Sequence, residues 1–219
     1  LTSWVSKPIR FFVLCAMLFF GLAFLSPSQL ALADDSPLTA ASLSGDNIFV
    51  DNGDATSDVV YLSDIPYASA KVGWGNLTLD KNGVNNGGIT LNVNGSATTF
   101  QKGIFAHATS TVDYDISQYS ADYLYFVTYY GLNTTNNNVG NGVKFYVYTS
   151  NDGVNWDLRT DADPASIKSG DGAGQFRIDV QGIKYIRLYA DANGSNASDH
   201  AAWADTKLVH EGYTDNIVR

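Results

Sequence analysis

The feature that most constrains the fold is a steady alternation, from residue 58 onward, between short β-rich runs and turn-forming clusters. No segment offers three turns of uninterrupted helical periodicity with capping residues. Short strands separated by turns at this spacing are typical of a β-sandwich or a barrel. The sequence therefore predicts an all-β fold with strands at residues 59–62, 89–93, 98–101, 103–107, 111–116, 123–130, 143–149, 175–180, 185–190 and 202–209.

The turn-forming residues support the same prediction. All of the 22 acidic residues except Glu211 are aspartate, and the chain contains 20 glycines. Aspartate and glycine favour turns, whereas glutamate favours helices. Asn94-Gly95 predicts a two-residue hairpin turn, and Asn151-Asp152-Gly153 predicts a three-residue turn with its glycine in the left-handed conformation.

Two runs indicate how their strands lie in a sheet. Between residues 143 and 149, Val143, Phe145 and Val147 alternate with more polar positions, which predicts one buried face. The run 123–130 is almost entirely apolar or aromatic. A central strand that is covered on both faces has this composition.

Residues 1–33 have the organisation of a secretory signal peptide. Lys7 and Arg10 precede an uncharged apolar run at residues 11–25, and Ala31-Leu32-Ala33 is a small-x-small cleavage pattern. We therefore expect a secreted or cell-surface protein without membrane insertion after cleavage. The alternative is a retained anchor, although about 15 apolar residues are short for a bilayer span.

The remaining residues predict one domain. Residues 34–57 are small and polar and are interpreted as a linker or N-terminal arm. Residues 58–213 have the size of a single domain with one core. Residues 214–219 are interpreted as a tail, and the sequence could be a truncated part of a longer protein.

Charge excludes one class of partner. The chain has 13 Lys and Arg against 22 acidic residues, a formal net charge of -9, with no basic cluster. Such a surface is repelled by phosphate groups, so neither nucleic acid nor an anionic membrane surface is an expected partner.

Calcium is a candidate cofactor. The single cysteine, Cys15, lies in the predicted signal peptide, so the exported part has no disulfide. One structural calcium would stabilise such a domain, and segments 46–58, 161–163 and 191–199 are rich in oxygen ligands. None has the EF-hand spacing, and the alternative is that these carboxylates form solvated turns. The metal ligands are left unassigned.

The sequence has no local signature of an enzyme. It contains no HExxH, GxSxG or Walker motif, no cysteine nucleophile in the exported part, and only three histidines. We therefore expect a non-catalytic domain.

Six candidate ligand-binding residues lie at predicted strand ends: Trp74, His107, Asp199, His200, Trp203 and Asp205. Trp74 lies between two glycines, which makes it the best candidate for an accessible ring. Sugar recognition needs an aromatic face for the apolar side of a pyranose and polar groups for its hydroxyls. The alternatives are that Trp203 belongs to the core and that His107 is a buried structural histidine. Trp156 is expected to pack a hairpin.

Four segments resemble a known family in order and spacing: YLSDIPYASAKVGWG, KGIFAHATSTVDYDIS, VKFYVYTSNDG and DHAAWADTKL. They resemble NPCBM, carbohydrate-binding module family 51, which is linked with glycoside hydrolase family 98. The resemblance implies a galactose-binding-like jelly-roll β-sandwich that recognises galactose-containing glycans, often as an accessory to a secreted glycosidase or adhesin. The six candidate residues fall on motif positions of the family.

One position departs from the family pattern. Family members commonly have an acidic pair after the long central strand, where this chain has Gly131-Leu132-Asn133-Thr134. The leading hypothesis is a secreted module in which Trp74 stacks on a galactose-like ring and His107, with Asp199 or Asp205, bonds its hydroxyls. The alternatives are the N-terminal part of a larger glycoside hydrolase whose catalytic domain follows, and a cell-surface adhesion module.

Overall fold

The computed structural model describes residues 59–133 and 140–214. The predicted signal peptide and linker lie outside the described residues. Apart from the 3-10 turn η1 (Leu62–Asp64), the described residues form strands, turns and loops. In these two ranges no helix is long and apolar enough to cross a bilayer.

The first sheet contains the longest strand of the domain. Its order is β11 (Gly174–Asp179), β8 (Tyr125–Leu132), β13 (Ala201–Val209), β6 (Gly103–Phe105) and β3 (Thr78–Leu79). β1 (Val59–Tyr61) also pairs with β13. In this order β8 and β13 each have a neighbouring strand on both sides, so they are the central strands of the sheet. The register between β13 and β8 shifts between Ala204 and Lys207, which indicates a bulge.

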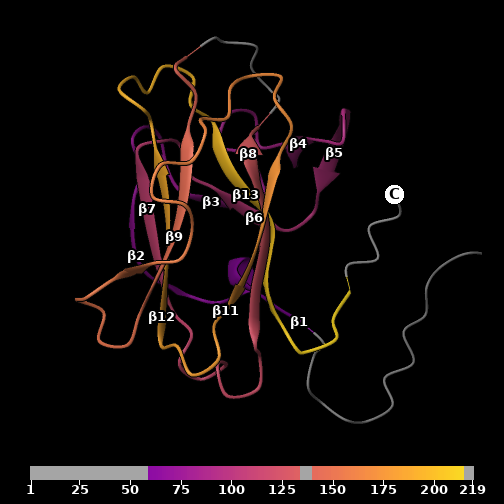
Figure 1. Cartoon of the computed structure of the whole chain (residues 1–219). Coiled ribbons are helices and arrows are strands. Elements are labelled where there is room, and N and C mark those ends of the chain that lie inside the picture. The colour runs from indigo at the N-terminus through magenta and orange to yellow at the C-terminus, as the bar shows by residue number, and fades with distance from the viewer. Residues whose placement is uncertain (1–58, 134–139, 215–219) are drawn as a thin grey trace, which may run out of the picture. The chain divides into compact units, whose positions relative to one another are not determined.

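The second sheet faces the first in a β-sandwich (Figure 1). Its order is β10 (Asp157–Leu158), β9 (Lys144–Ser150), β12 (Tyr185–Asp191), β7 (Ser110–Asp115) and β2 (Tyr67–Lys71). Its inner face carries Phe145, Val147, Ile186 and Leu188, which are buried in the main core together with Trp203 of the opposite sheet. The alternation predicted for β9 is confirmed, with the addition that Tyr146 on the outer face is also buried.

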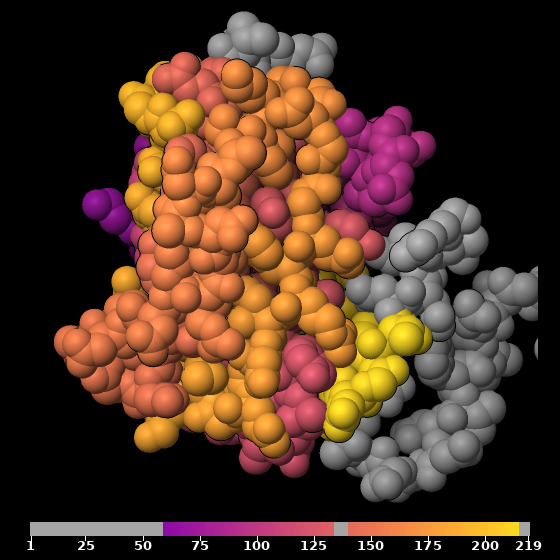
Figure 2. Space-filling view, viewed as in Figure 1, coloured from indigo at the N-terminus to yellow at the C-terminus, as the bar shows by residue number. Residues whose placement is uncertain are grey.

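A hairpin of β4 (Ile89–Val93) and β5 (Ser96–Phe100) packs on the outside of the first sheet. Asn94 and Gly95 both have positive φ, which confirms the predicted hairpin turn. In the space-filling view the hairpin, in magenta, stands at the side of the sandwich (Figure 2). Its apolar residues form a second small core with Phe105, Ala202 and Ala204. β13 is therefore buried on both faces.

All of the predicted strands are present, with ends that shift by at most two residues. The strands that sequence reasoning missed are β2, β3 and β10. Every residue of β2 is exposed, so it has no apolar alternation, and the other two strands have two residues each. The turn at Gly153 is also confirmed by its positive φ. Trp156 packs under the Arg187 guanidinium, 4.0 Å from the ring centroid.

Candidate functional site

Backbone hydrogen bonds join three segments at one end of the sandwich. These segments are residues 72–77 after β2, residues 106–109 after β6 and residues 192–200 before β13. The Gly73 N–H donates to the His107 carbonyl at 2.9 Å, and the Ala108 N–H donates to the Asp199 carbonyl at 3.0 Å. A Cβ at Gly73 would lie 2.1 Å from the Ala108 carbonyl oxygen. Only glycine therefore allows residue 74 to be placed beside His107.

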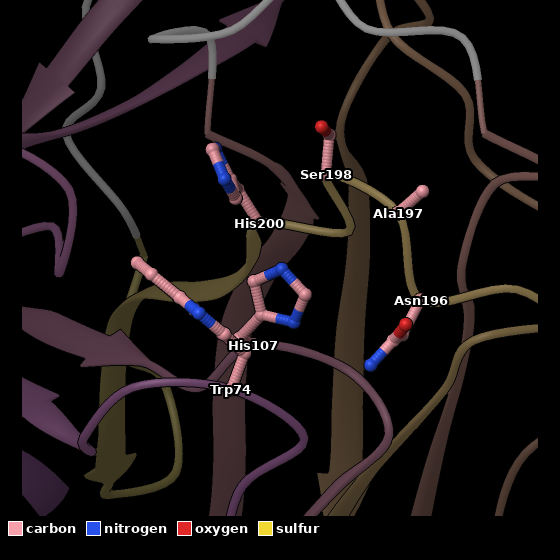
Figure 3. Close-up of a pocket in the computed structure, with 6 residues that line it drawn as sticks. All are labelled: Trp74, His107, Asn196, Ala197, Ser198 and His200. Carbon is pink, nitrogen blue, oxygen red and sulfur yellow. The ribbon is translucent and has the colours of Figure 1, made fainter.

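These segments enclose a shallow cavity of about 320 Å³, here called the loop-end pocket. It is lined by Trp74, His107, Asn196, Ala197, Ser198 and His200. Figure 3 shows the three rings on one side and residues 196–198 on the other, with open space between them. The Trp74 and His107 ring centroids are 5.6 Å apart, and those of His107 and His200 are 5.4 Å apart. The pocket thus combines ring faces with polar groups.

Trp74 is the accessible ring of this pocket. Its side chain is 57% exposed, whereas both histidines are buried. An indole of this size normally buries most of its area, so an exposed one beside a cavity is available to a ligand. The placement agrees with the expectation from its flanking glycines.

Burial favours the neutral form of both imidazoles of the pocket. Burial lowers the pKa of His107, and its Nδ1 lies 2.9 Å from the Ala108 carbonyl oxygen. Nδ1 must carry the proton in that contact, so the lone pair of Nε2 is left to accept. Burial, and then repulsion from His107 in its protonated form, lower the pKa of His200. The buried Nδ1 of His200 has no partner among the described residues. The pair offers neutral hydrogen-bonding groups to a ligand.

Asp199 lies beside the pocket without lining it. It is buried, its Oδ2 has no hydrogen-bond partner in the described part of the chain, and burial raises its pKa to about 6. Its backbone carbonyl accepts from the N–H groups of Ala108 and Ala201. The backbone of Asp199 therefore holds two walls of the pocket together.

We expect the Asp199 carboxyl to make stability depend on pH. An unfolded aspartate has a pKa near 3.9, so the folded state binds the proton more tightly. The contribution of this group is complete below about pH 4 and is lost as the pH rises through about 6. Relative to the wild type, Asp199→Asn should gain on the order of 2 kcal/mol of unfolding free energy between about pH 4 and pH 7.

Urea denaturation of both proteins across this pH range measures the difference. The two histidines have lowered pKa values and lose stability as the pH falls, but they are present in both proteins and cancel in the difference. Parallel stability curves for the two proteins would contradict the raised pKa.

Besides Asp199, two further predicted ligand residues do not line the pocket. Trp203 is fully buried in the main core, because its position in β13 faces the opposite sheet. Asp205 follows at the bulge of β13 with positive φ, and its Oδ2 accepts from the Lys207 ammonium at 2.7 Å. Both residues are framework, and the core alternative that the sequence left open for Trp203 is the one observed.

Sequence reasoning missed the opposite wall of the pocket, residues Asn196, Ala197 and Ser198. Ser198 has positive φ and the His200 N–H donates to its carbonyl at 2.9 Å. This compact turn brings the wall towards the rings. A polar run directly before the Asp199-His200 pair was the available signal, but its conformation decides which side chains face the cavity.

Calcium is not supported by a ligand set in the described residues. They contain no group of three or more His, Cys, Asp or Glu residues that could hold a metal ion. Asp163 forms an ion pair with Lys144, and Asp191 accepts from the Asn193 N–H. The oxygen-rich segment 46–58 lies outside the described residues. The structural calcium stays a prediction.

Asn133 has a structural role at the position of the family departure. It is buried, its Oδ1 accepts from the Thr90 N–H at 2.7 Å, and its own N–H donates to the His200 carbonyl at 2.8 Å. Asn133 thus ties the β4–β5 hairpin to the segment that carries His200.

A β-sandwich with a shallow pocket at its loop end, one exposed indole and buried neutral imidazoles defines a ligand-binding module. The chain belongs to the NPCBM/NEW2 domain family, whose model matches residues 58–209. This match confirms the family resemblance seen in the four sequence segments. Among curated proteins, no sequence matches the chain.

Solved structures of family 51 carbohydrate-binding modules have the same fold. One is the module of a Clostridium perfringens family 95 glycoside hydrolase in complex with methyl-galactose: 27% identity, TM-score 0.62, covering 69% of this chain and 99% of that one. Another is the second such module of Clostridium perfringens ZmpB with GlcNAc, solved with INT domains: 31% identity, TM-score 0.61, covering 71% of this chain and 32% of that one. A longer ZmpB structure also contains a catalytic domain: 31% identity, TM-score 0.59, covering 69% of this chain and 15% of that one.

These matches confirm the galactose-binding-like β-sandwich. The domain is a carbohydrate-binding module of the family 51 type, and such modules are non-catalytic. Modules of this type occur in the same polypeptide as catalytic domains.

Proposed function

We propose that the loop-end pocket binds the terminal galactose of a glycan. The observation that carries the proposal is the exposed Trp74 indole beside the buried His107 and His200. A sugar seated in the pocket covers the indole with its apolar C–H face. Its hydroxyls donate to His107 Nε2 and exchange hydrogen bonds with the Asn196 amide.

The choice of galactose is supported by one relative and challenged by another. The family 95 hydrolase module is solved with methyl-galactose, whereas the ZmpB module is solved with GlcNAc. Titration calorimetry with methyl galactoside and with GlcNAc distinguishes the two sugars. We expect methyl galactoside to bind with a dissociation constant between about 1 μM and 1 mM, because a shallow site contacts few ligand atoms. Binding of GlcNAc alone would overturn the galactose assignment.

Replacing Trp74 with alanine is expected to weaken methyl galactoside binding at least about tenfold, since the stacking surface is lost. The free energy of unfolding should change by less than about 0.5 kcal/mol, because the ring is exposed. Calorimetry and urea denaturation measure the two effects.

Tyr67→Ala is the matched control for Trp74→Ala. Tyr67 is 47% exposed and does not line the loop-end pocket. Its loss should leave sugar affinity unchanged. An unchanged affinity in Trp74→Ala would remove the indole from the binding site.

The setting of the module is part of the proposal. We propose that it is exported through residues 1–33 and positions a catalytic domain of the same polypeptide on galactose-containing surfaces. The support is the signal-peptide pattern and the ZmpB relative that contains such a domain. The mass of the exported protein and the reading frame after residue 219 test these two points. Retention on cells without competition by free galactose would instead favour the adhesion alternative.

A further inference from the structure

A second cavity of about 750 Å³ adjoins the loop-end pocket, and we call it the lateral groove. Residues lining it include Lys71, Gly73, Thr109, Asp191, Ser195 and Asn196. Asn196 lines both cavities, and Gly73 of the groove directly precedes Trp74 of the pocket. A ligand that leaves the pocket past Asn196 therefore enters the groove.

The walls of the groove are polar and balanced in charge. Lys71 supplies a cation and Asp191 an anion, while Thr109, Ser195 and Asn196 supply hydroxyl and amide groups. Both donors and acceptors are present, which suits a neutral ligand that is rich in hydroxyls. The Thr109 hydroxyl accepts from the Ala192 N–H at 3.2 Å, and the Asp191 carboxylate accepts from the Asn193 N–H at 3.0 Å. The walls are therefore held in place before a ligand arrives.

The groove continues onto the outer face of the second sheet. The register places Lys71 opposite Thr111, Thr111 opposite Tyr189, and Tyr189 opposite Tyr146. Asp191 follows Tyr189 by two residues and so lies on the same face of the sheet. The Tyr146 and Tyr189 ring centroids are 5.7 Å apart, and Tyr189 is partly exposed. Tyr189 therefore lies on the same face of the sheet as Asp191 of the groove, and its ring is the aromatic group nearest in the register that a sugar could contact.

We propose that the lateral groove is a subsite for the sugar units that follow the terminal residue of a neutral oligosaccharide. This inference rests on the proposed function, because the terminal sugar must occupy the loop-end pocket. It adds that the module reads more than one sugar unit. Affinity then rises with oligosaccharide length.

Calorimetry of the full chain with methyl galactoside, galactobiose and galactotriose, in both the α-linked and the β-linked series, tests the subsite. We expect galactotriose of one series to bind about tenfold more tightly than methyl galactoside, which corresponds to one or two additional net hydrogen bonds. Equal affinities for all lengths in both series would overturn the inference. If no sugar of the panel binds, the proposed function fails as well, and this outcome is distinct from equal affinities.

Two variants test whether the increase in affinity with oligosaccharide length arises in the lateral groove. Ser195→Trp fills the groove and should remove the gain while the affinity for methyl galactoside stays within about twofold, a change below one hydrogen bond. Lys71→Ala removes one wall without adding bulk and should lower galactotriose affinity by about threefold. If Ser195→Trp also weakens methyl galactoside binding, the Lys71→Ala result decides whether the groove binds the further sugar units. Tyr67→Ala, on the same strand as Lys71 but outside the groove, is the control. A length-dependent gain that survives both groove variants would place the extension elsewhere.

Discussion

Replacing Trp203 with alanine is expected to lower the free energy of unfolding by about 3–5 kcal/mol, which is the cost of removing a large aromatic side chain from a core. Trp203 is fully buried between the two sheets. Its ring meets Phe145 edge to face at 5.2 Å between centroids and lies 6.2 Å from Tyr130. No neighbouring group can fill so large a cavity without moving strands. Urea denaturation followed by circular dichroism measures the loss.

Two comparisons separate this core role from ligand binding. Trp203→Phe should cost less, about 1–2 kcal/mol, because it keeps a ring in the core and also removes an indole N–H that has no partner among the described residues. Trp74→Ala removes the same side chain from an exposed site and should have almost no effect on stability. A stable Trp203→Ala protein that loses only sugar binding would contradict the core assignment.

Replacing Asp205 with asparagine is expected to destabilise the domain by about 3 kcal/mol, because it removes the negative charge to which a buried ammonium donates. Lys207 is 2% exposed, and its ammonium donates to Asp205 Oδ2 at 2.7 Å and to the Tyr213 hydroxyl at 2.9 Å. Asparagine is chosen because residue 205 has positive φ, which asparagine tolerates. The measured change therefore reports the charge and not the backbone.

Asp163→Asn is the matched control for Asp205→Asn. It removes the carboxylate from the Lys144–Asp163 ion pair, in which Asp163 is 85% exposed. Exposed pairs contribute about 0–1 kcal/mol, so this variant should remain close to the wild type. Equal losses in the two variants would show that burial does not set the strength of the Lys207 pair. Methyl galactoside affinity should be unchanged in both, since neither residue lines the loop-end pocket.

The strands were predictable because each carries a local signal. Ile89 to Val93 and Asn94-Gly95 show alternation and a turn type within one short window, and the structure has this hairpin, with its second strand beginning at Ser96. β2 was missed because an edge strand exposed along its whole length has no apolar alternation. Strands could therefore be predicted where one face is buried, because burial of one face requires alternating apolar residues.

The site was only partly predictable. Trp74, His107 and His200 line the loop-end pocket, and Asp199 lies beside it, whereas Trp203 and Asp205 lie in the framework. Asp199, His200, Trp203 and Asp205 all fall within seven positions, so proximity in sequence suggested one site. In β13 successive side chains point to opposite faces, and the bulge changes this direction once more. Residues that are close in sequence, such as His200 and Trp203, therefore lie in the pocket and in the core, respectively.

The all-β class, most strand positions, the hairpin turn and the family could be predicted from the sequence, because these depend on local periodicity, turn chemistry and motif order. Which polar and aromatic groups come into contact depends on how distant segments pack in the folded domain. The hairpin covers the outer face of β13, the Ser198 turn brings Asn196 opposite the rings, and the Asp199 carbonyl joins two segments that are about ninety residues apart. The hairpin contact is apolar packing, the Ser198 turn is set by its own backbone conformation, and the Asp199 contact is a backbone hydrogen bond between distant segments. No local pattern in the sequence specifies any of the three.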